Sequence, residues 1–211
     1  MERMLTPPEH DALSQRIRAA EMRTTGEIYC VVTRASDSYF LPAAFMLALG
    51  VLLVSVPVAI WLDRSWLGLQ HLVFVAAQAA ALAAALLLLR AVPRLRILLV
   101  PKRLRFRRAH DNALRQFLAH NIHRTQRRTG VLLFVSLAEH YVEIVADDGI
   151  DEKVAQDEWN AIVARLTAAA AAGRLVEGLA DAVDRAGALL ALHFPGGVRN
   201  PNELDDHVVE I

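Results

Sequence analysis

The chain has 211 residues, of which 55% are hydrophobic and 22% charged, and its 23 basic and 23 acidic side chains balance. A neutral chain has no overall field that attracts nucleic acid, so we expect no nucleic-acid partner. The single cysteine, Cys30, cannot form an internal disulfide, which fits a reducing compartment. The first forty residues show no apolar core of the kind that a signal peptide requires, and none is expected.

These forty residues predict one helix and one strand. Residues 6–24 carry apolar side chains at helical spacing, and Thr6, Pro7 and Glu9 are typical of a helix start with a capping box. The segment GEIYCVVT, residues 26–33, is β-branched and apolar on both faces. That pattern predicts a strand covered on both sides, in which Cys30 is a small core residue.

Two uncharged apolar runs follow, and only Asp63 and Arg64 separate them. Residues 40–62 and 65–89 each exceed the roughly 20 residues that a helix needs to cross a bilayer. They predict a transmembrane hairpin within residues 40–92. Tryptophan and basic side chains flank such spans at the membrane surface. The residues predicted to anchor this hairpin are Trp61, Trp66, Arg90, Arg94, Arg96, Lys102 and Arg103.

The distribution of charge around the hairpin predicts its orientation. Eight basic residues and no acidic residue lie between Arg90 and Arg108, immediately after the second span. Basic segments next to a span stay in the cytoplasm, and two spans return the chain to the side on which it started. We therefore expect a two-span protein of the cell inner membrane with both termini cytoplasmic. The bilayer is its first partner, a membrane protein is a second candidate, and the oligomeric state is open.

The second half of the chain predicts a helix from Pro101 to about Arg128, strands at 131–136 and 141–146, and two helices that end near 172 and 192. Residues 196–211 are predicted to be a flexible acidic tail. One strand before the hairpin has to join two strands after it. Residues 1–39 and 93–195 are therefore predicted to be two parts of one α/β domain.

An acidic turn follows the second of these strands. Asp147, Asp148 and Asp151 surround Gly149, and Ca²⁺ prefers several oxygen ligands from a tight turn. One interpretation is a metal site formed by these three aspartates, although their spacing differs from that of an EF-hand loop. The other is that an aspartate caps the next helix and complements its dipole. The sequence leaves both interpretations open.

The turn between the two strands carries Glu139 and His140. A carboxylate beside an imidazole is suited to acid–base chemistry, but solvated hairpin tips often carry the same residue types. We interpret the pair as part of a surface for a ligand or partner. The sequence contains no P-loop, no dinucleotide-binding turn and no nucleophile elbow, so no catalytic residue is assigned.

The segment from Thr129, TGVLLFVSLAEHYVEIVADDGID, resembles the TPM-domain family. Its shared features are a Thr–Gly pair, an apolar strand that ends in serine, a glutamate and a basic residue in the turn, and an Asp–Gly–Ile turn that opens a helix. These features fall at Thr129, Gly130, Ser136, Glu139, His140, Asp148, Gly149 and Ile150. Trp159 and the pair Phe194–Pro195 resemble the membrane-inserted bacterial branch of the family.

The resemblance implies a small α/β sandwich of a few strands with flanking helices, interrupted here by the hairpin. Some relatives are linked to acid phosphatase activity, others to calcium binding, and plant relatives to photosystem repair. The commoner family pattern has a glycine where this chain has Asp147.

Two hypotheses of function follow. The first is a membrane accessory protein whose domain binds a partner or ligand at the membrane surface. The alternative is a weak metal-assisted phosphatase that uses residues 147–151 with Ca²⁺.

Overall fold

The computed structural model describes residues 4–64, 71–196, 204 and 207–211, except for the side chains of residues 71, 72 and 151. The chain divides into two compact units. The first unit contains residues 1–36 and 106–211, and the second contains residues 37–105. A single insertion therefore interrupts the first unit.

A mixed four-stranded sheet forms the centre of the first unit, in the order β3-β2-β1-β4. β1 (Glu27–Thr33) runs parallel to β2 (Gly130–Ser136) and to β4 (Val208–Glu210), whereas β3 (Tyr141–Ala146) is antiparallel to β2. Every residue of β1 and β2 is buried, as their continuous apolar sequences predict. The predicted fold class, mixed α/β with flanking helices, is confirmed.

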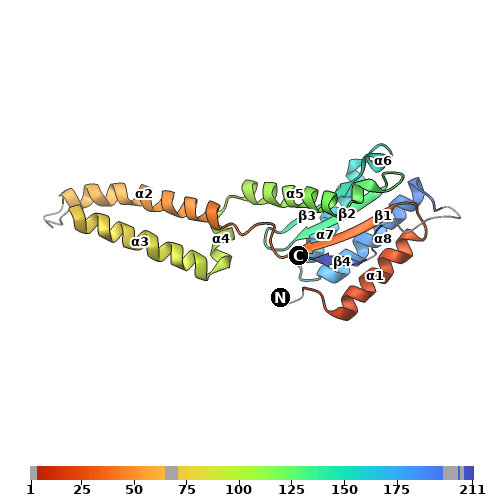
Figure 1. Ribbon diagram of the computed structural model, residues 1–211, viewed down its shortest axis with the longest axis horizontal. Helices are drawn as coiled ribbons and strands as arrows, with labels where there is room; N and C mark the ends of the chain where they lie inside the picture. Colours follow the sequence, from red (N-terminus) through yellow and green to blue (C-terminus); the bar gives the residue numbers. More distant parts are fainter. Residues whose placement is uncertain (1–3, 65–70, 197–203, 205–206) are drawn as a thin grey trace. The chain divides into compact units, whose positions relative to one another are not determined.

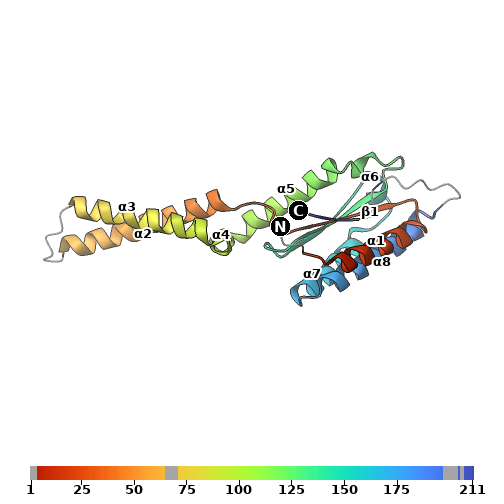
Figure 2. The ribbon, with the colours of Figure 1, turned by 60° about the horizontal axis from the view of Figure 1, so that its bottom comes forward.

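Helices cover both faces of this sheet, which gives the first unit three layers (Figures 1 and 2). One face packs against α1 (Pro7–Glu21), α7 (Gln156–Ala171) and α8 (Leu175–His193). The other face packs against α5 (Lys102–Ala119) and a 3₁₀ turn, Ile122–Arg124. The alternation of β1 divides its side chains between these layers: Cys30 faces α1 and α8, and Tyr29 and Val31 face α5.

Two predicted elements differ from the structure. The helix predicted to reach Arg128 ends at Ala119, because Asn121 adopts a left-handed backbone conformation with φ 56° that stops α-helical hydrogen bonding. The tail predicted to be flexible contains β4, which pairs with the free edge of β1. Glu210 carboxylate oxygens also accept hydrogen bonds from the backbone of Met4 and Leu5, at 2.8 and 3.3 Å. These contacts hold the last residues of the chain on the domain.

The second unit contains two long apolar helices and a short one. They are α2 (Phe40–Arg64), α3 (His71–Ala91) and α4 (Pro93–Leu99). The most apolar 18-residue window has a mean hydropathy of 2.5 in α2 and of 2.0 in Val73–Ala91, and only 6% of each window is buried. Both helices are therefore long and apolar enough to span a membrane. The short helix α4 begins two residues after α3 ends and carries the predicted anchor residues Arg94 and Arg96.

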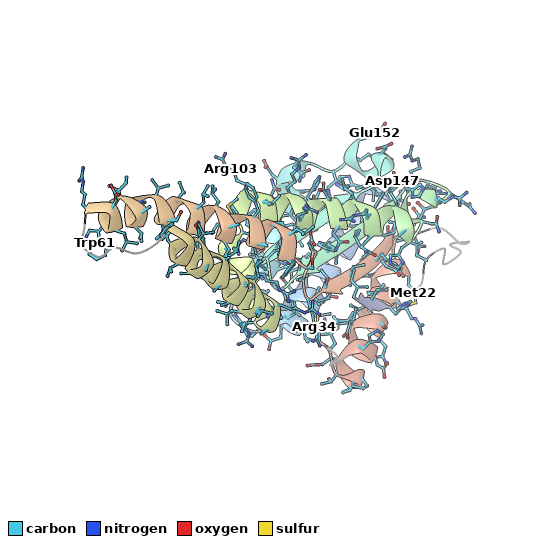
Figure 3. All side chains as sticks on the ribbon, turned by 60° about the vertical axis from the view of Figure 1, so that its left-hand side comes forward. Met22, Arg34, Trp61, Arg103, Asp147 and Glu152 are labelled. Carbon is cyan, nitrogen blue, oxygen red and sulfur yellow. The ribbon has the colours of Figure 1, made fainter. Side chains whose placement is uncertain are left out.

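The predicted anchor residues have different environments within this unit. Trp61 is 64% exposed near the end of α2 (Figure 3), whereas Trp66 lies outside the described residues. The Arg96 guanidinium donates to the carbonyl oxygens of Leu89 and Arg90, each at 2.9 Å, and so caps the carboxyl end of α3. The side chains exposed to solvent are those of Arg90, Arg94, Lys102 and Arg103.

Candidate functional site

The two turns singled out from the sequence lie at opposite ends of the β2–β3 hairpin. Ser136 pairs with Tyr141 at one end and Val131 with Ala146 at the other, so the paired strands separate the turns by roughly 17 Å. Glu139 and His140 lie at the first end, and Asp147 and Asp148 at the second. This distance is too long for one small ligand to contact both turns, so each turn is a separate candidate site.

Glu139 forms a buried polar cluster at the carboxyl ends of β1 and β2. Its side chain is 2% exposed, and it accepts a hydrogen bond from the backbone N–H of Ser36 at 2.7 Å and another from the Ser136 hydroxyl. The Ser36 hydroxyl in turn donates to Ser136 Oγ at 3.0 Å. Glu139 therefore links the segment that follows β1 to the end of β2. Because it is buried, it is not the solvated residue of a hairpin tip that the sequence also allowed.

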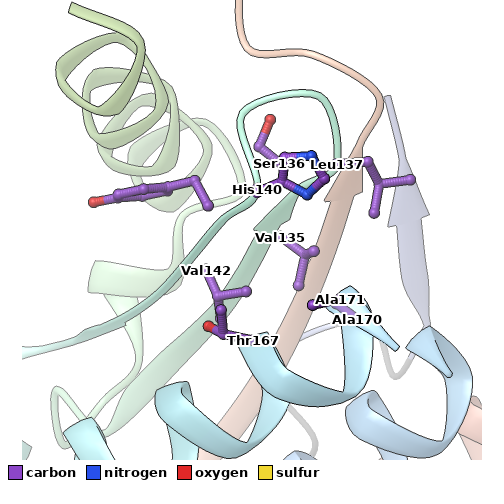
Figure 4. A pocket seen from close by; sticks show the side chains of 9 residues that line it. Val135, Ser136, Leu137, His140, Val142, Thr167, Ala170 and Ala171 are labelled. Atoms are coloured by element: carbon purple, nitrogen blue, oxygen red, sulfur yellow. The ribbon is translucent and has the colours of Figure 1, made fainter. Parts of the chain in front are cut away.

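A small pocket opens beside this cluster (Figure 4). It has a volume of about 200 Å³, with Val135 and Val142 on its walls and Thr167 and Ala170 contributed by α7. His140 borders it with its imidazole, whereas the Ser136 hydroxyl points away from the pocket and donates to Glu139. His140 is exposed and has φ 51°, an uncommon conformation for a residue with a side chain. The turn thus holds an imidazole beside a mainly apolar pocket.

Tyr141 lies beside the same pocket and stays protonated. Burial, and then the neighbouring Glu143 carboxylate, raise the pKa of its hydroxyl. The hydroxyl donates to Glu143 Oε2 at 3.0 Å, and Glu143 Oε1 lies 2.8 Å from His110 Nδ1. Tyr141 therefore acts as a hydrogen-bond donor at this end of the sheet and not as a base.

The chain leaves and re-enters the first unit at the same end of the sheet. Ser36, the last residue before the insertion, bonds to Glu139, and Phe106, the first residue after it, packs on Tyr141 with ring centroids 5.4 Å apart. We name the group formed by Ser36, Ser136, Glu139, His140 and Tyr141 the carboxyl-end cluster. Both covalent connections to the apolar helices begin beside this cluster.

The acidic turn at the other end is organised by a cap and an arginine. Asp147 is 3% exposed, and its Oδ1 accepts from the backbone N–H of Asp148 at 2.8 Å, which caps the short helix α6 (Asp148–Asp151). Arg128 Nη2 lies 3.2 Å from Asp147 Oδ1 and 3.0 Å from Asp148 Oδ2. Figure 3 marks Asp147 and, just beyond α6, Glu152.

These contacts leave a poor donor set for a cation. Ca²⁺ takes six to eight oxygen ligands. Arg128 already neutralises Asp147 and Asp148, and among the described residues no three acidic, histidine or cysteine side chains are grouped to hold a metal. The buried Asp147 Oδ2 has no hydrogen-bond partner, but one free oxygen does not make a site. The side chain of Asp151, the third predicted ligand, lies outside the described residues. Calcium at this turn stays a prediction, and the described residues do not fit it.

Sequence analysis missed three members of the carboxyl-end cluster as site residues. Ser36 is separated from Ser136 by a hundred residues, and no local pattern links them. Ser136, in contrast, ends one predicted strand, and Tyr141 begins the next. The predicted hairpin therefore already implied that these two residues lie at the same end of the sheet. Cys30, predicted to be a core residue, is 1% exposed, and burial raises the pKa of its thiol and keeps it unreactive.

The fold and the site define a class of protein. It is an α/β domain with an apolar helical hairpin inserted in the sequence between two central strands, β1 and β2, that pair in the sheet. The chain belongs to the TPM-domain family, because the family profile described as the TPM domain matches residues 73–189, more than half of the chain. This match confirms the resemblance to the TPM-domain family, whereas the resemblance to its membrane-inserted bacterial branch stays a prediction. The match does not include α1 or β1, although β1 lies between β2 and β4 in the sheet.

A solved structure has the same fold. The NMR structure of BA42 protein from the psychrophilic bacterium Bizionia argentinensis aligns with a TM-score of 0.63 and 19% sequence identity. The alignment covers 100% of this chain and 98% of that one. At this identity the likeness concerns the fold alone. A comparison with curated proteins finds no match.

Proposed function

We propose that this chain is a membrane-tethered TPM domain that binds a membrane protein partner, as a non-enzymatic accessory module. In this proposal α2 and α3 cross the bilayer. The observation that supports insertion is that the most apolar 18-residue windows of two adjacent helices have mean hydropathies of 2.5 and 2.0 and are only 6% buried. The core helices of soluble proteins bury such surfaces, because exposed apolar area costs roughly 25 cal/mol per Å².

The topology of the sheet supports one orientation for both termini. β1 precedes the hairpin and lies between β2 and β4, which follow it. If α2 and α3 span the membrane, both flanks have to be on the same side for this sheet to form. The run of basic residues after α3 favours the cytoplasmic side of the inner membrane. The positive-inside rule and the sheet thus support the same arrangement by independent arguments.

The pocket beside the carboxyl-end cluster is the proposed binding site. At about 200 Å³ it is smaller than the roughly 300–1,000 Å³ of ligand pockets, and it suits one apolar side chain of a protein partner. The exposed His140 imidazole beside the pocket is available to bond that partner's backbone. The single observation that carries this choice is that the pocket lies beside Ser36 and Tyr141, where the chain leaves and re-enters the first unit, and that only three residues separate Ser36 from α2.

A photocrosslinking experiment tests the proposed site. A photoreactive amino acid replaces Ala138, which lies in the same turn as His140 but does not line the pocket, in the full-length chain in native membranes, and discrete adducts are compared in three backgrounds, the first without a further substitution. Ala170→Leu fills the pocket and is expected to abolish the adduct. Ala172→Leu, at an exposed position outside the pocket, is expected to leave it unchanged. An adduct that survives Ala170→Leu contradicts binding in the pocket, and a chain that alkaline carbonate extracts from the membrane contradicts insertion.

The phosphatase alternative has no supporting observation in the described residues. Its predicted metal ligands pair with Arg128, and no nucleophile accompanies them there. Turnover of a phosphoester in the presence of Mg²⁺ or Ca²⁺ that disappears in Asp148→Ala, with the fold retained, would revive it.

A further inference from the structure

An open groove runs along one side of the α2–α3 hairpin. It has a volume of about 620 Å³ and is lined almost entirely by apolar side chains. On α2 it follows Gly50, Val54, Val58 and Leu62, which share one helix face at spacings of four residues. This face extends over roughly 18 Å, since each helical residue adds about 1.5 Å.

One amide group interrupts the apolar lining. Gln78 lies on the groove side of α3, seven residues after His71 and thirteen before Ala91, and it is half-buried. In the part of the chain that the structure describes, its side-chain amide has no hydrogen-bond partner. Ser55, the other polar residue of the groove, already donates to the carbonyl oxygen of Leu52 at 2.7 Å. Gln78 is therefore the one group lining the groove that lacks a partner.

Gly50 gives the groove a second unusual feature. A glycine inside a helix lowers helix stability relative to alanine, so such residues usually allow a close contact. Nothing in the described structure lies within 4 Å of the position that a Cβ at Gly50 would occupy. The missing side chain thus improves no contact within the hairpin. It leaves space on the groove for a side chain from another molecule.

We propose that the groove binds a second copy of this chain, and that Gln78 of each copy bonds Gln78 of the other across a two-fold axis. The inference rests on the proposed function only in that the hairpin is taken to lie in a bilayer. A glutamine amide has a donor and an acceptor, so two symmetry-related copies exchange two hydrogen bonds without any further residue type. Neither of the facing helices carries a charge along the groove that would oppose this pairing.

The bilayer explains why this amide selects a partner. Lipid tails offer no hydrogen bonds, and polar side chains in spans therefore associate with one another. Small side chains such as Gly50, Ala77 and Ala81 let helices from two copies approach closely. A lipid acyl chain would fill the groove but would leave the Gln78 amide without a partner.

Energy transfer between labelled copies tests this interface. Full-length chains carrying a donor or an acceptor fluorophore at the N-terminal amine are mixed in vesicles of phosphatidylcholine and phosphatidylglycerol, and transfer is followed as the lipid-to-protein ratio rises. The wild-type chain is expected to show transfer that unlabelled chain competes away. Gln78→Leu, which keeps the span apolar, is expected to weaken association roughly tenfold. Gly50→Phe, which fills the groove, is expected to weaken it as well.

The matched control is Ala79→Leu, on the face of α3 away from the groove, which is expected to leave transfer unchanged. Equal transfer in the wild type and Gln78→Leu overturns the interface, and so does an absence of competable transfer for a wild-type chain that resists carbonate extraction. A chain that carbonate extracts overturns insertion and with it the dimer. The extraction assay therefore distinguishes failure of the proposed function from failure of the interface alone.

Discussion

The two ends of the β2–β3 hairpin each bury a carboxylate, and they stabilise it in different ways. Glu139 is 2% exposed and accepts from a backbone N–H and a serine hydroxyl, both uncharged donors. Asp147 is 3% exposed, caps α6 and pairs with Arg128, whose side chain is 56% exposed. The first carboxylate joins segments that are distant in sequence, and the second organises a local turn. Burial alone therefore does not identify a functional acid.

The largest expected effect is that of Glu139→Ala. The substitution leaves the Ser36 N–H and the Ser136 hydroxyl without their acceptor, and hydrogen bonds to charged groups contribute about 1.5–3 kcal/mol each, so we expect a loss of about 3 kcal/mol. Urea unfolding in detergent measures it, with Trp159 as the fluorescent reporter in a Trp61→Phe, Trp66→Phe background. Glu139→Gln keeps an acceptor and should lose about half as much. Losses below 1 kcal/mol for both variants contradict a linking role.

Asp147→Ala tests the other end with the same reporter. It removes a helix cap and a half-exposed ion pair, so we expect a loss of about 1.5 kcal/mol, smaller than at Glu139. Asp147→Asn retains the cap acceptor and should lose less. The comparison between the ends fails if Asp147→Ala proves as costly as Glu139→Ala.

A carboxylate outside both turns provides a reference for exposed pairs. Hydrogen bonds from Arg165 and then Arg185 lower the pKa of Asp181 on α8. A lowered pKa means that the stabilisation is present above the unfolded-state pKa and is lost as the pH falls through the folded-state pKa. Because Asp181 is 39% exposed, we expect Asp181→Asn to lose no more than about 0.5 kcal/mol at pH 7. Urea unfolding at pH 7 and in strong acid measures the difference in stability between the wild type and Asp181→Asn. This difference should disappear once the Asp181 carboxyl of the wild type is protonated.

The smallest expected effect is that of calcium at the acidic turn. Calorimetric titration of the wild-type chain is expected to show only heat of dilution, since Arg128 occupies Asp147 and Asp148. Arg128→Ala removes the cation that pairs with Asp147 and Asp148, and its calcium titration is compared with that of the wild type. Binding by the wild type that Asp148→Ala removes would establish the predicted metal site and would reverse the contrast between the two ends.

Continuous apolar sequences predicted the central part of the fold. β1 and β2 bury every residue, and a strand of this composition has few alternatives. β4 was not predictable, because three residues of a polar tail form a strand only against an edge that β1 provides. The end of α5 depends on the single left-handed residue Asn121 within an otherwise helical pattern. The site was predicted in part: Glu139 and His140 by their residue types, but not Ser36, whose contact depends on tertiary structure.

The insertion between β1 and β2 has a consequence for synthesis at the ribosome. Glu27 pairs with Gly130, so β1 waits for 103 further residues before its neighbour exists. At about 5–20 residues per second, that delay is roughly 5–20 s. Both apolar helices emerge during this interval. Translation order thus completes both apolar helices before the sheet can close, and under the proposed membrane arrangement insertion precedes the folding of the domain.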